Sequence, residues 1–494
     1  GGGGLLELFC GWGKCLAIDT PILMYDGSIK KVQDVQIGDV LMGDDSTPRN
    51  VLSLARGKEQ MYRITNMYNE SYIVNESHIL SLKCSIDVDN MYLKDEIVDI
   101  SVKDYLSLKA SSIKNYSSNL MGYKVGVDFK ESDVDVDVDS YLFGYWLGNG
   151  YNNTINITLD NVSVYENINK ICKESHDGLL LNYNYLSIYS IFKLDKPSNV
   201  ANFFKKNNLF NKKYIPYIYK CNSRHNRLNL LAGIIDGIGI LTNTNTIYKI
   251  YINNNNDLVN DIVFLVRSLG IACYVNMNTT IVIYGKEIQQ IPVKNVNKKI
   301  KNIHTIVNLD SLISPINIEK LDIDDYYGFC IDGNRRFLLG DFTVTHNTDA
   351  TLYTISRLKK KTLIIVHKEF LMNQWIERIN KYYPTAKIGK IQGQVIDIND
   401  KDIVLCMLQS LSMKDYPSTL FDSFGFTIID EVHHISSEVF SCALFKLVTK
   451  YMLGLSATMN RKDGTTKVFK MFRSEEHTSE LQSPCNLVCR LLLE

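Results

Sequence analysis

The sequence predicts a multidomain fold in which an all-β region and a mixed α+β region interrupt an α/β lobe with a parallel sheet. The first observation is length, because 494 residues exceed the roughly 100–200 residues of a typical domain. The second is a change of pattern: short strand segments with Asp-Gly and Gly-Asp turns come first, whereas buried strands alternate with helical segments after residue 348. The third is a broken phosphate-binding loop, Gly11 to Lys14, which lacks the Ser or Thr that should follow its lysine.

The composition is that of an ordinary soluble globular protein, with 45% hydrophobic and 22% charged residues. Basic and acidic residues balance at 54 each, so any nucleic-acid surface must be a local patch. No apolar run reaches the roughly 18 residues of a membrane span, and no signal segment is recognisable. The eleven cysteines show no zinc-like spacing, and their odd count without a secretion signal favours reduced thiols. We therefore expect a cytoplasmic protein without a membrane partner; its oligomeric state stays open.

Residues 1–14 are interpreted as the start of the interrupted lobe. A short buried strand leads into a loop whose backbone N–H groups and lysine side chain can bind phosphate. The candidate phosphate-binding residues are Gly11, Gly13 and Lys14. On these residues alone an ordinary turn is the better interpretation. Removal of residues 15–347, however, would join the lysine to Thr348 and complete the loop as Gly-Trp-Gly-Lys-Thr.

Residues 15–130 predict an all-β region with tight turns, and two of their segments carry a family resemblance. Cys15 with the following "TPILMYDGSIKKVQDVQIGDVLMG", and "YIVNESHILSL" around His78, resemble the first two blocks of an intein. That family has a horseshoe-like all-β splicing fold, the Hint domain. The resemblance implies that Cys15 is the nucleophile and that His78 donates a proton to the leaving amide nitrogen. Asn75 stands where the family usually has Thr, and it would help polarise the scissile bond.

Residues 131–310 predict an α+β domain with two glycine-bearing helical segments. "LFGYWLGNG" and "LAGIIDGIG" resemble the LAGLIDADG motif of homing endonucleases, in which two helices pack through small residues. In that family each helix ends with an acid that binds Mg²⁺ above the DNA. Here the two acid positions hold Asn149 and Ile238, and Lys213 matches a lysine often found between the motifs. Because Mg²⁺ favours carboxylates, we expect a domain that keeps its fold and has lost DNA cleavage.

Residues 311–347 predict two strands around a glycine-bearing turn, Tyr326 to Gly333 and Phe337 to Thr345. They resemble the last two intein blocks. Many inteins place an Asp at the position of Gly328 and a His near Arg335. Cys330 or Asp332 could substitute for these groups, and the sequence does not choose between them.

The triplet His346-Asn347-Thr348 ends this region. Asn347 can attack its own backbone carbonyl through its side-chain nitrogen and cut the chain, while His346 polarises that carbonyl or moves protons. Thr348 carries the hydroxyl that would accept the N-terminal acyl group. A triplet of this kind is a chance event in most proteins, but here it lies where the broken loop resumes.

Residues 348–472 predict the remainder of the α/β lobe. Buried strands followed by polar loops are predicted in "TLIIVHKEFLMNQW", "DIVLCMLQSL" and "FTIIDEVHH", and helices from Asp349 to Lys360 and from Glu369 to Tyr382. "DEVH" from Asp430 resembles the DExH box of superfamily-two helicases, and the later "SAT" resembles their coupling motif. The resemblance implies one RecA-like lobe, built from residues 1–14 and 348–472, that binds nucleic acid and uses ATP with Mg²⁺. Its implied ligands are Lys14 and Thr348 for phosphates and Mg²⁺, Asp430 for Mg²⁺, and Glu431 for the attacking water.

Residues 473–494 break the helicase pattern abruptly, and we interpret them as translated sequencing-adapter read-through. The second helicase lobe is not among these residues, so we expect a fragment.

The leading hypothesis is a precursor that splices itself without a cofactor. The alternatives are a nucleic-acid-dependent ATPase with an inert insert, an active site-specific homing endonuclease, and a Hedgehog-like autoprocessing domain. The last of these needs neither the His-Asn-Thr triplet nor a resuming host sequence.

Overall fold

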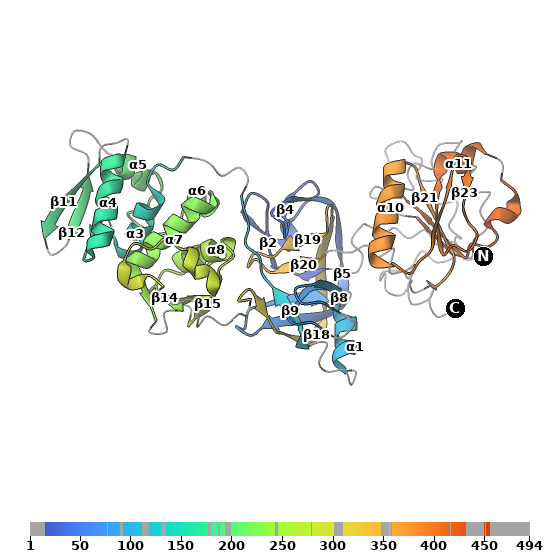
Figure 1. The fold of residues 1–494 in the computed structure, drawn as a ribbon, viewed down its shortest axis with the longest axis horizontal. Helices are drawn as coiled ribbons and strands as arrows, with labels where there is room; N and C mark the ends of the chain where they lie inside the picture. The colour runs from blue at the N-terminus through green and yellow to red at the C-terminus, as the bar shows by residue number, and fades with distance from the viewer. Residues whose placement is uncertain are drawn as a thin grey trace.

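The computed structural model describes residues 15–454 except for a set of short segments (Figure 1). These segments are residues 77, 89–91, 111–117, 130–134, 152, 176–178, 186–187, 193–198, 243–245, 278, 301–309, 347–354, 356–357, 415, 431–448 and 450. Several predicted site residues therefore lie outside the described residues: Gly11, Gly13, Lys14, Asn347, Thr348 and Glu431. The predicted strand near the N-terminus, most of the helix predicted from Asp349 and the "SAT" segment also lie outside them.

The first β region contains two main antiparallel sheets, as the turn-rich pattern predicts. The first sheet has the strand order β18 (Ile316–Ile331), β1 (Leu16–Ala17), β6 (Ser71–Asn75), β5 (Pro48–Asn66) and β4 (Val40–Met42). The second has the order β17 (Ile313–Ser314), β9 (Leu120–Tyr123), β7 (Ile79–Cys84), β20 (Val344–His346) and β19 (Arg336–Leu338), with β8 (Ile97–Ser101) also on β7. A hairpin of β2 (Pro21–Leu23) and β3 (Ile29–Lys31), the 3-10 turn η1 (Val32–Asp34) and helix α1 (Val102–Ala110) complete this region.

Strands from both ends of the predicted insert meet in each sheet. The long strand β18 pairs with β5 along most of its length and also with β1, where Leu16 lies opposite Tyr327. In the second sheet His346 of β20 lies opposite Ile79 of β7. Alternating apolar side chains from both sheets fill one buried core, which holds these pairings together.

The prediction of one strand from Phe337 to Thr345 is wrong in one respect. Residues 337–345 form two strands, β19 and β20, which a turn at residues 339–343 separates. Asp341 stabilises that turn, because its carboxylate accepts hydrogen bonds from the Thr343 N–H at 3.1 Å and the Thr343 hydroxyl at 2.9 Å. Phe342 adopts a left-handed backbone with φ 70°, which no strand residue could have.

The middle region is α+β, as predicted. Two of its helices, which are far apart in the sequence, pack against each other. These helices are α3 (Ser140–Asn149) and α7 (Arg224–Ile238). A Cβ atom on Gly144 would lie 2.1 Å from the Leu230 carbonyl oxygen, and one on Gly233 would lie 2.2 Å from the Tyr141 carbonyl oxygen. Only glycine therefore permits this close backbone contact.

Sheets and further helices surround this helix pair (Figure 1). One sheet has the order β10 (Asn156–Thr158), β12 (Ile188–Phe192), β11 (Leu180–Tyr185), and the other has the order β13 (Gly239–Leu241), β14 (Ile247–Tyr251), β16 (Thr280–Tyr284), β15 (Ala272–Asn276). The helices are α4 (Val162–Glu174), α5 (Asn199–Lys206), α6 (Tyr217–Lys220) and α8 (Asn256–Ser268), with 3-10 turns η2 (Lys286–Gln290) and η3 (Val296–Lys298). A single large core joins these elements.

The C-terminal part of the described chain is a mostly parallel sheet, which confirms the α/β prediction. Its order is β23 (Val395–Ile396), β22 (Ile388–Gln392), β24 (Ile403–Met407), β21 (Thr362–Val366), β25 (Phe426–Ile429), β26 (Tyr451–Gly454). Helix α10 spans Glu369–Tyr382, as predicted, and α11 (Leu408–Met413) and the 3-10 turn η4 (Ser418–Phe421) follow β24 and precede β25.

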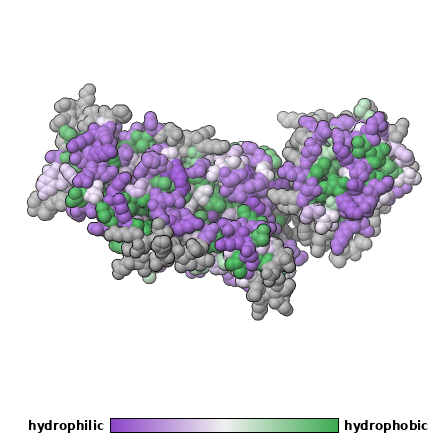
Figure 2. Space-filling view, in the orientation of Figure 1, coloured by the Kyte–Doolittle hydropathy of each residue, from purple (hydrophilic) through white to green (hydrophobic). Residues whose placement is uncertain are grey.

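The face of the molecule in Figure 2 carries mainly hydrophilic residues over the first β region and the middle region. Within the part of the chain that the structure describes, every helix is too short or too polar to cross a bilayer.

Candidate active site

Cys15 is buried directly before β1, with 1% of its surface exposed. It packs in a small apolar cluster with Ala55, Met61 and Tyr326. Extension of the β1–β18 register by one residue places Cys15 opposite Gly328. The position where many inteins carry an acid therefore presents no side chain to the thiol.

Asn75 binds Cys15 through two hydrogen bonds. The Cys15 backbone N–H donates to the Asn75 side-chain oxygen at 2.9 Å, and the Asn75 N–H donates to the Cys15 carbonyl at 3.1 Å. The Asn75 side-chain nitrogen donates to the carboxylate of Glu59 on the neighbouring strand β5. Since the bond to Glu59 fixes which end of the side-chain amide faces Cys15, Glu59 orients Asn75 on the nitrogen of the predicted scissile bond.

His78 connects the two ends of the predicted insert. Its backbone N–H donates to the Asn75 carbonyl at 3.1 Å, so the histidine follows Asn75 in a tight turn. Its ring Nε2 lies 2.6 Å from the hydroxyl of Thr345, and both side chains are buried. The hydroxyl of Thr345 therefore fixes the orientation of the imidazole.

His346 lies on β20, directly after Thr345, with 2% of its surface exposed. Its Nε2 is 3.8 Å from a carboxylate oxygen of Asp99 on β8, which also binds Arg336 at 2.6 Å. Burial acts to raise the pKa of Asp99, but the charges of His346 and Arg336 and the hydrogen bond from Arg336 hold that pKa below its ordinary value. The ionised Asp99 carboxylate therefore lies beside the imidazole of the residue that precedes the predicted C-terminal junction.

Arg56 places a positive charge near the thiol. Its guanidinium lies 4.9 Å from the ring centre of Tyr327 and donates to the Gly328 carbonyl at 3.0 Å. Burial lowers the pKa of Arg56, while the charges of the Cys15 thiolate and of Tyr327 act to raise it. A cation beside a cysteine favours the thiolate, which is the nucleophilic form.

The two substitutes considered for the absent acid and histidine differ in their surroundings. Both carboxylate oxygens of Asp332 bind Asn50, at 2.8 Å to its backbone N–H and 2.7 Å to its side chain. Asp332 thus closes the β5–β18 pair, and Cys330 is half-buried on the same strand. The acid that reaches the Cys15–Asn75 pair is Glu59, which the sequence did not identify.

In the middle region the two acid positions of the resembling motifs carry no carboxylate. Asn149 uses its side-chain nitrogen to donate to the Thr158 carbonyl at 2.9 Å, and Ile238 packs against the core. Asp236 accepts hydrogen bonds from the Tyr141 hydroxyl at 2.7 Å and the Lys294 N–H at 2.6 Å, which tie it to the packing of α7. No group of three His, Cys, Asp or Glu that could hold a metal occurs among the described residues.

Lys213 caps the C-terminal end of α3. Its ammonium donates to the carbonyls of Trp146, Leu147 and Gly150 at 3.1, 3.2 and 2.7 Å. Burial lowers the pKa of Lys213 to about 8. The side chain thus stabilises the helix end, where carbonyl oxygens otherwise lack donors.

Asp430 directly follows β25 at the carboxyl edge of the parallel sheet. The Trp375 indole N–H of α10 donates to its carboxylate at 2.8 Å, and its backbone N–H donates to the Ile365 carbonyl at 2.9 Å. A carboxylate at this edge has the placement and chemistry that a Mg²⁺–nucleotide site requires. Its predicted neighbour in that site, Glu431, lies outside the described residues.

Comparison with known proteins separates the chain into two matched parts. Residues 15–119 match the family model of the Hom_end-associated Hint domain, and residues 343–461 match that of the type III restriction enzyme res subunit. A mimivirus protein from Acanthamoeba polyphaga mimivirus, assigned as the ATP-dependent RNA helicase L396, is 37% identical over 141 residues, which cover 28% of this chain and 27% of that protein. The DNA 3'-5' translocase XPB2 of Sulfurisphaera tokodaii is 31% identical over 166 residues, which cover 33% of this chain and 36% of that protein.

Among solved structures, the gp41-1 intein is similar to this chain, with 21% sequence identity and a TM-score of 0.13. The similarity covers 18% of this chain and 79% of the intein. A substituted variant of the same intein gives a TM-score of 0.14. The chain spans about a third or less of the length of the two helicase-type relatives. A match to the Hom_end-associated Hint domain at the start of the described chain is thus followed by a match to helicase-type proteins, an arrangement that fits an intein in a helicase.

Proposed function

We propose that residues 15–347 excise themselves and join Lys14 to Thr348. The supporting observation is that Cys15, Asn75, His78, Thr345 and His346 form one buried, connected set, although they come from opposite ends of the insert. Reacting groups that a fold holds in place behave as if they were at very high local concentration. A rigid β fold would therefore supply much of the rate of splicing. The proposed reaction needs neither ATP nor another cofactor.

In the first step the Cys15 sulfur attacks the Lys14 carbonyl carbon. The carbon–nitrogen bond breaks, the Cys15 nitrogen takes up a proton as an amine, and a thioester forms. His78 is assigned as the proton donor. Asn75 holds the Cys15 nitrogen, because its side-chain oxygen accepts a hydrogen bond of 2.9 Å from the Cys15 N–H. Arg56 favours the thiolate that starts the step.

In the second step the Thr348 hydroxyl attacks the thioester carbonyl, which releases the Cys15 thiol and forms an ester. The side-chain nitrogen of Asn347 then attacks its own carbonyl carbon, the bond to the Thr348 nitrogen breaks, and Asn347 becomes a succinimide. His346, supported by Asp99, is assigned the proton transfers of this step. The freed Thr348 amine attacks the ester carbonyl and leaves an ordinary peptide bond.

Expression of the wild-type chain should give an excised 15–347 fragment and a ligated product, measured by intact mass. Cys15→Ala removes the nucleophile and Asn347→Ala removes the cyclising group, so each should abolish the ligated product. Asn347→Ala should retain thioester formation, seen as N-terminal cleavage by added thiol. A wild-type chain that stays at full length under all conditions would contradict the proposal.

Thr345→Val should slow thiol-induced N-terminal cleavage by about tenfold or more, because it removes the hydroxyl that orients His78 and leaves the volume unchanged. The pH profile of this cleavage should shift, since the bond partner of the imidazole is lost. Thr345→Ser keeps the hydroxyl and serves as the control. Equal rates for the Val and Ser variants would rule out this positioning role.

We further propose that the ligated product regains a nucleotide site, with Lys14, Thr348 and Asp430 holding the phosphates of ATP and their Mg²⁺. The bound Mg²⁺ would neutralise phosphate charge, as in related ATPases. The proposal is supported by the placement of Asp430 at the carboxyl edge of the parallel sheet. Nucleic acid is the proposed partner of the restored lobe.

The unspliced Asn347→Ala chain should bind a fluorescent ATP analogue at least about tenfold more weakly than the ligated product, because the insert separates the loop N–H groups from Thr348. Fluorescence titration with Mg²⁺ present measures both affinities. Equal affinities would favour the alternative of an ATPase with an inert insert.

The middle region is proposed to be a LAGLIDADG-type domain that no longer cleaves DNA. The contacts of Asn149, Ile238 and Asp236 leave no carboxylate at either motif end to hold Mg²⁺. Incubation of the excised fragment with Mg²⁺ and DNA that spans the uninterrupted gene junction should give no cut product on a gel. A double-strand cut at that junction would instead establish an active endonuclease.

A further inference from the structure

The middle region and the first β region share one hydrophobic cluster. Cys221 and Phe264 of the middle region pack in it with residues of β2, β4, β9, β19 and β20. Val344, two residues before His346, belongs to this cluster and is 1% exposed. Side chains of the middle region therefore form part of the core that supports the end of the insert.

Phe264 of α8 contacts the turn between β19 and β20. Its ring centre lies 5.1 Å from that of Phe342 in an edge-to-face arrangement, and Phe342 is fully buried. Phe342 has φ 70°, a left-handed conformation that is unfavourable for a bulky residue and persists only where packing enforces it. The Phe264 ring is one of the groups that enforce this conformation.

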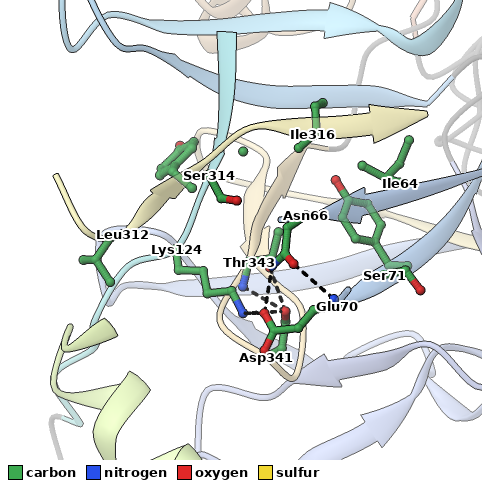
Figure 3. A pocket seen from close by; sticks show the side chains of 13 residues that line it. Ile64, Asn66, Glu70, Ser71, Lys124, Leu312, Ser314, Ile316, Asp341 and Thr343 are labelled. Atoms are coloured by element: carbon green, nitrogen blue, oxygen red, sulfur yellow. Dashed lines mark hydrogen bonds and ion pairs between the residues drawn. The ribbon is translucent and has the colours of Figure 1, made fainter. Parts of the chain in front are cut away.

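A charged cluster links the same turn to α8 by a second route. The Lys124 ammonium lies 2.7 Å from a carboxylate oxygen of Glu70 and 2.8 Å from one of Asp341. Figure 3 shows the three side chains converging beside Thr343, whose N–H and hydroxyl bind Asp341. Lys124 therefore holds two carboxylates, one of which shapes the turn that leads into β20.

Arg267, one helical turn after Phe264, completes this cluster from the middle region. Its guanidinium binds Glu70 and is largely buried. With Arg267 present, two cations face two carboxylates; without it, Lys124 alone would serve Glu70 and Asp341. Burial acts to raise the pKa of Asp341, but the charges of Lys124 and Arg267 hold it far below the ordinary range, so the carboxylate stays ionised and shapes the turn.

Tyr68 adds a third contact between the two regions. Its ring stacks on that of Tyr274 of β15, with ring centres 4.6 Å apart and planes at 11°. Tyr68 and Glu70 lie in the same turn. The side-chain oxygen of Asn66 closes this turn, because it accepts hydrogen bonds from the backbone N–H groups of both residues. The turn that presents Glu70 to Lys124 is thus itself packed on the middle region.

From these contacts we propose that the middle region acts as a support for the C-terminal splice junction. Phe264 and Arg267 are positioning residues: they fix the β19–β20 turn, and through it the strand that carries Thr345 and His346. A domain that has lost DNA cleavage would thus retain a role in protein splicing. This inference rests on the proposed splicing function.

The test uses full-length chains with Cys15→Ala, in which only C-terminal cleavage by Asn347 can occur. Phe264→Ala and Arg267→Met should each slow release of the segment that begins at Thr348 by about tenfold, since misplacement by about 1 Å costs up to 10²-fold in rate. Arg267→Lys, which keeps the charge, should restore part of the rate. In the Asn347→Ala background, thiol-induced cleavage at Cys15 should change less than C-terminal cleavage does.

Ile262→Ala is the matched control. Ile262 is fully buried on the same helix but faces the core of the middle region, so its truncation weakens that region without touching the turn. If Ile262→Ala slows C-terminal cleavage as much as Phe264→Ala does, the specific positioning role is overturned. Unchanged cleavage in both Phe264→Ala and Arg267→Met would overturn it as well.

Hydrogen exchange of the peptide that covers residues 337–346 gives a readout that does not depend on splicing. Its amides should exchange faster in Phe264→Ala and Arg267→Met than in Ile262→Ala, because the turn has lost its support. Equal protection in the three variants would refute the proposal, even if the wild-type chain showed no splicing. Absence of all cleavage with altered exchange would instead refute the splicing function alone.

Discussion

The hydrogen bond between His78 and Thr345 joins side chains that are 267 residues apart, and the arrangement of the active site depends on it. It connects the turn that binds Cys15 to the strand that carries His346. Both ends of the bond are buried, so water does not compete for it and the imidazole has one defined orientation. A splicing reaction needs this constraint, because its two junctions must react in sequence within one site. The β1–β18 and β7–β20 pairings supply the rigid frame that brings the bond partners together.

The charged groups around Cys15 come from other positions than the acid that many inteins carry near the nucleophile. Gly328 leaves the thiol without the acid that many inteins carry, whereas Glu59 reaches the same region through Asn75. Arg56 donates to the carbonyl of Gly328, the register partner of Cys15, and so adds a cation to this part of the sheet. Side chains of β5, which pairs with both β6 and β18, therefore supply the charged groups around the nucleophile. The middle region extends this frame, since Phe264 and Arg267 reach the turn before β20.

The sequence predicted the features that depend on local pattern or on neighbouring residues. Turn-forming pairs predicted the β region, and the helical pattern predicted α10 to the residue. The bounds of the insert, which the broken loop indicates, stay a prediction. The sequence could not identify Glu59, Asp99 or Arg56, because their roles depend on the register of strands that are distant along the chain. It also missed the turn at Phe342, since nothing in "FLLGDFTVTH" predicts a left-handed aromatic residue. That conformation exists because a helix from another region packs against it.

The proposed excision must leave the phosphate loop without a scar, because an added or missing residue between Lys14 and Thr348 would disrupt the N–H groups that bind phosphate. The most direct measurement is tandem mass spectrometry of the proteolytic peptide that spans this junction after expression of the wild-type chain. Splicing at the proposed junctions should give a peptide in which Gly-Trp-Gly-Lys is followed immediately by Thr348. Detection of only the Lys14–Cys15 and Asn347–Thr348 junctions, with no ligated peptide, would contradict it.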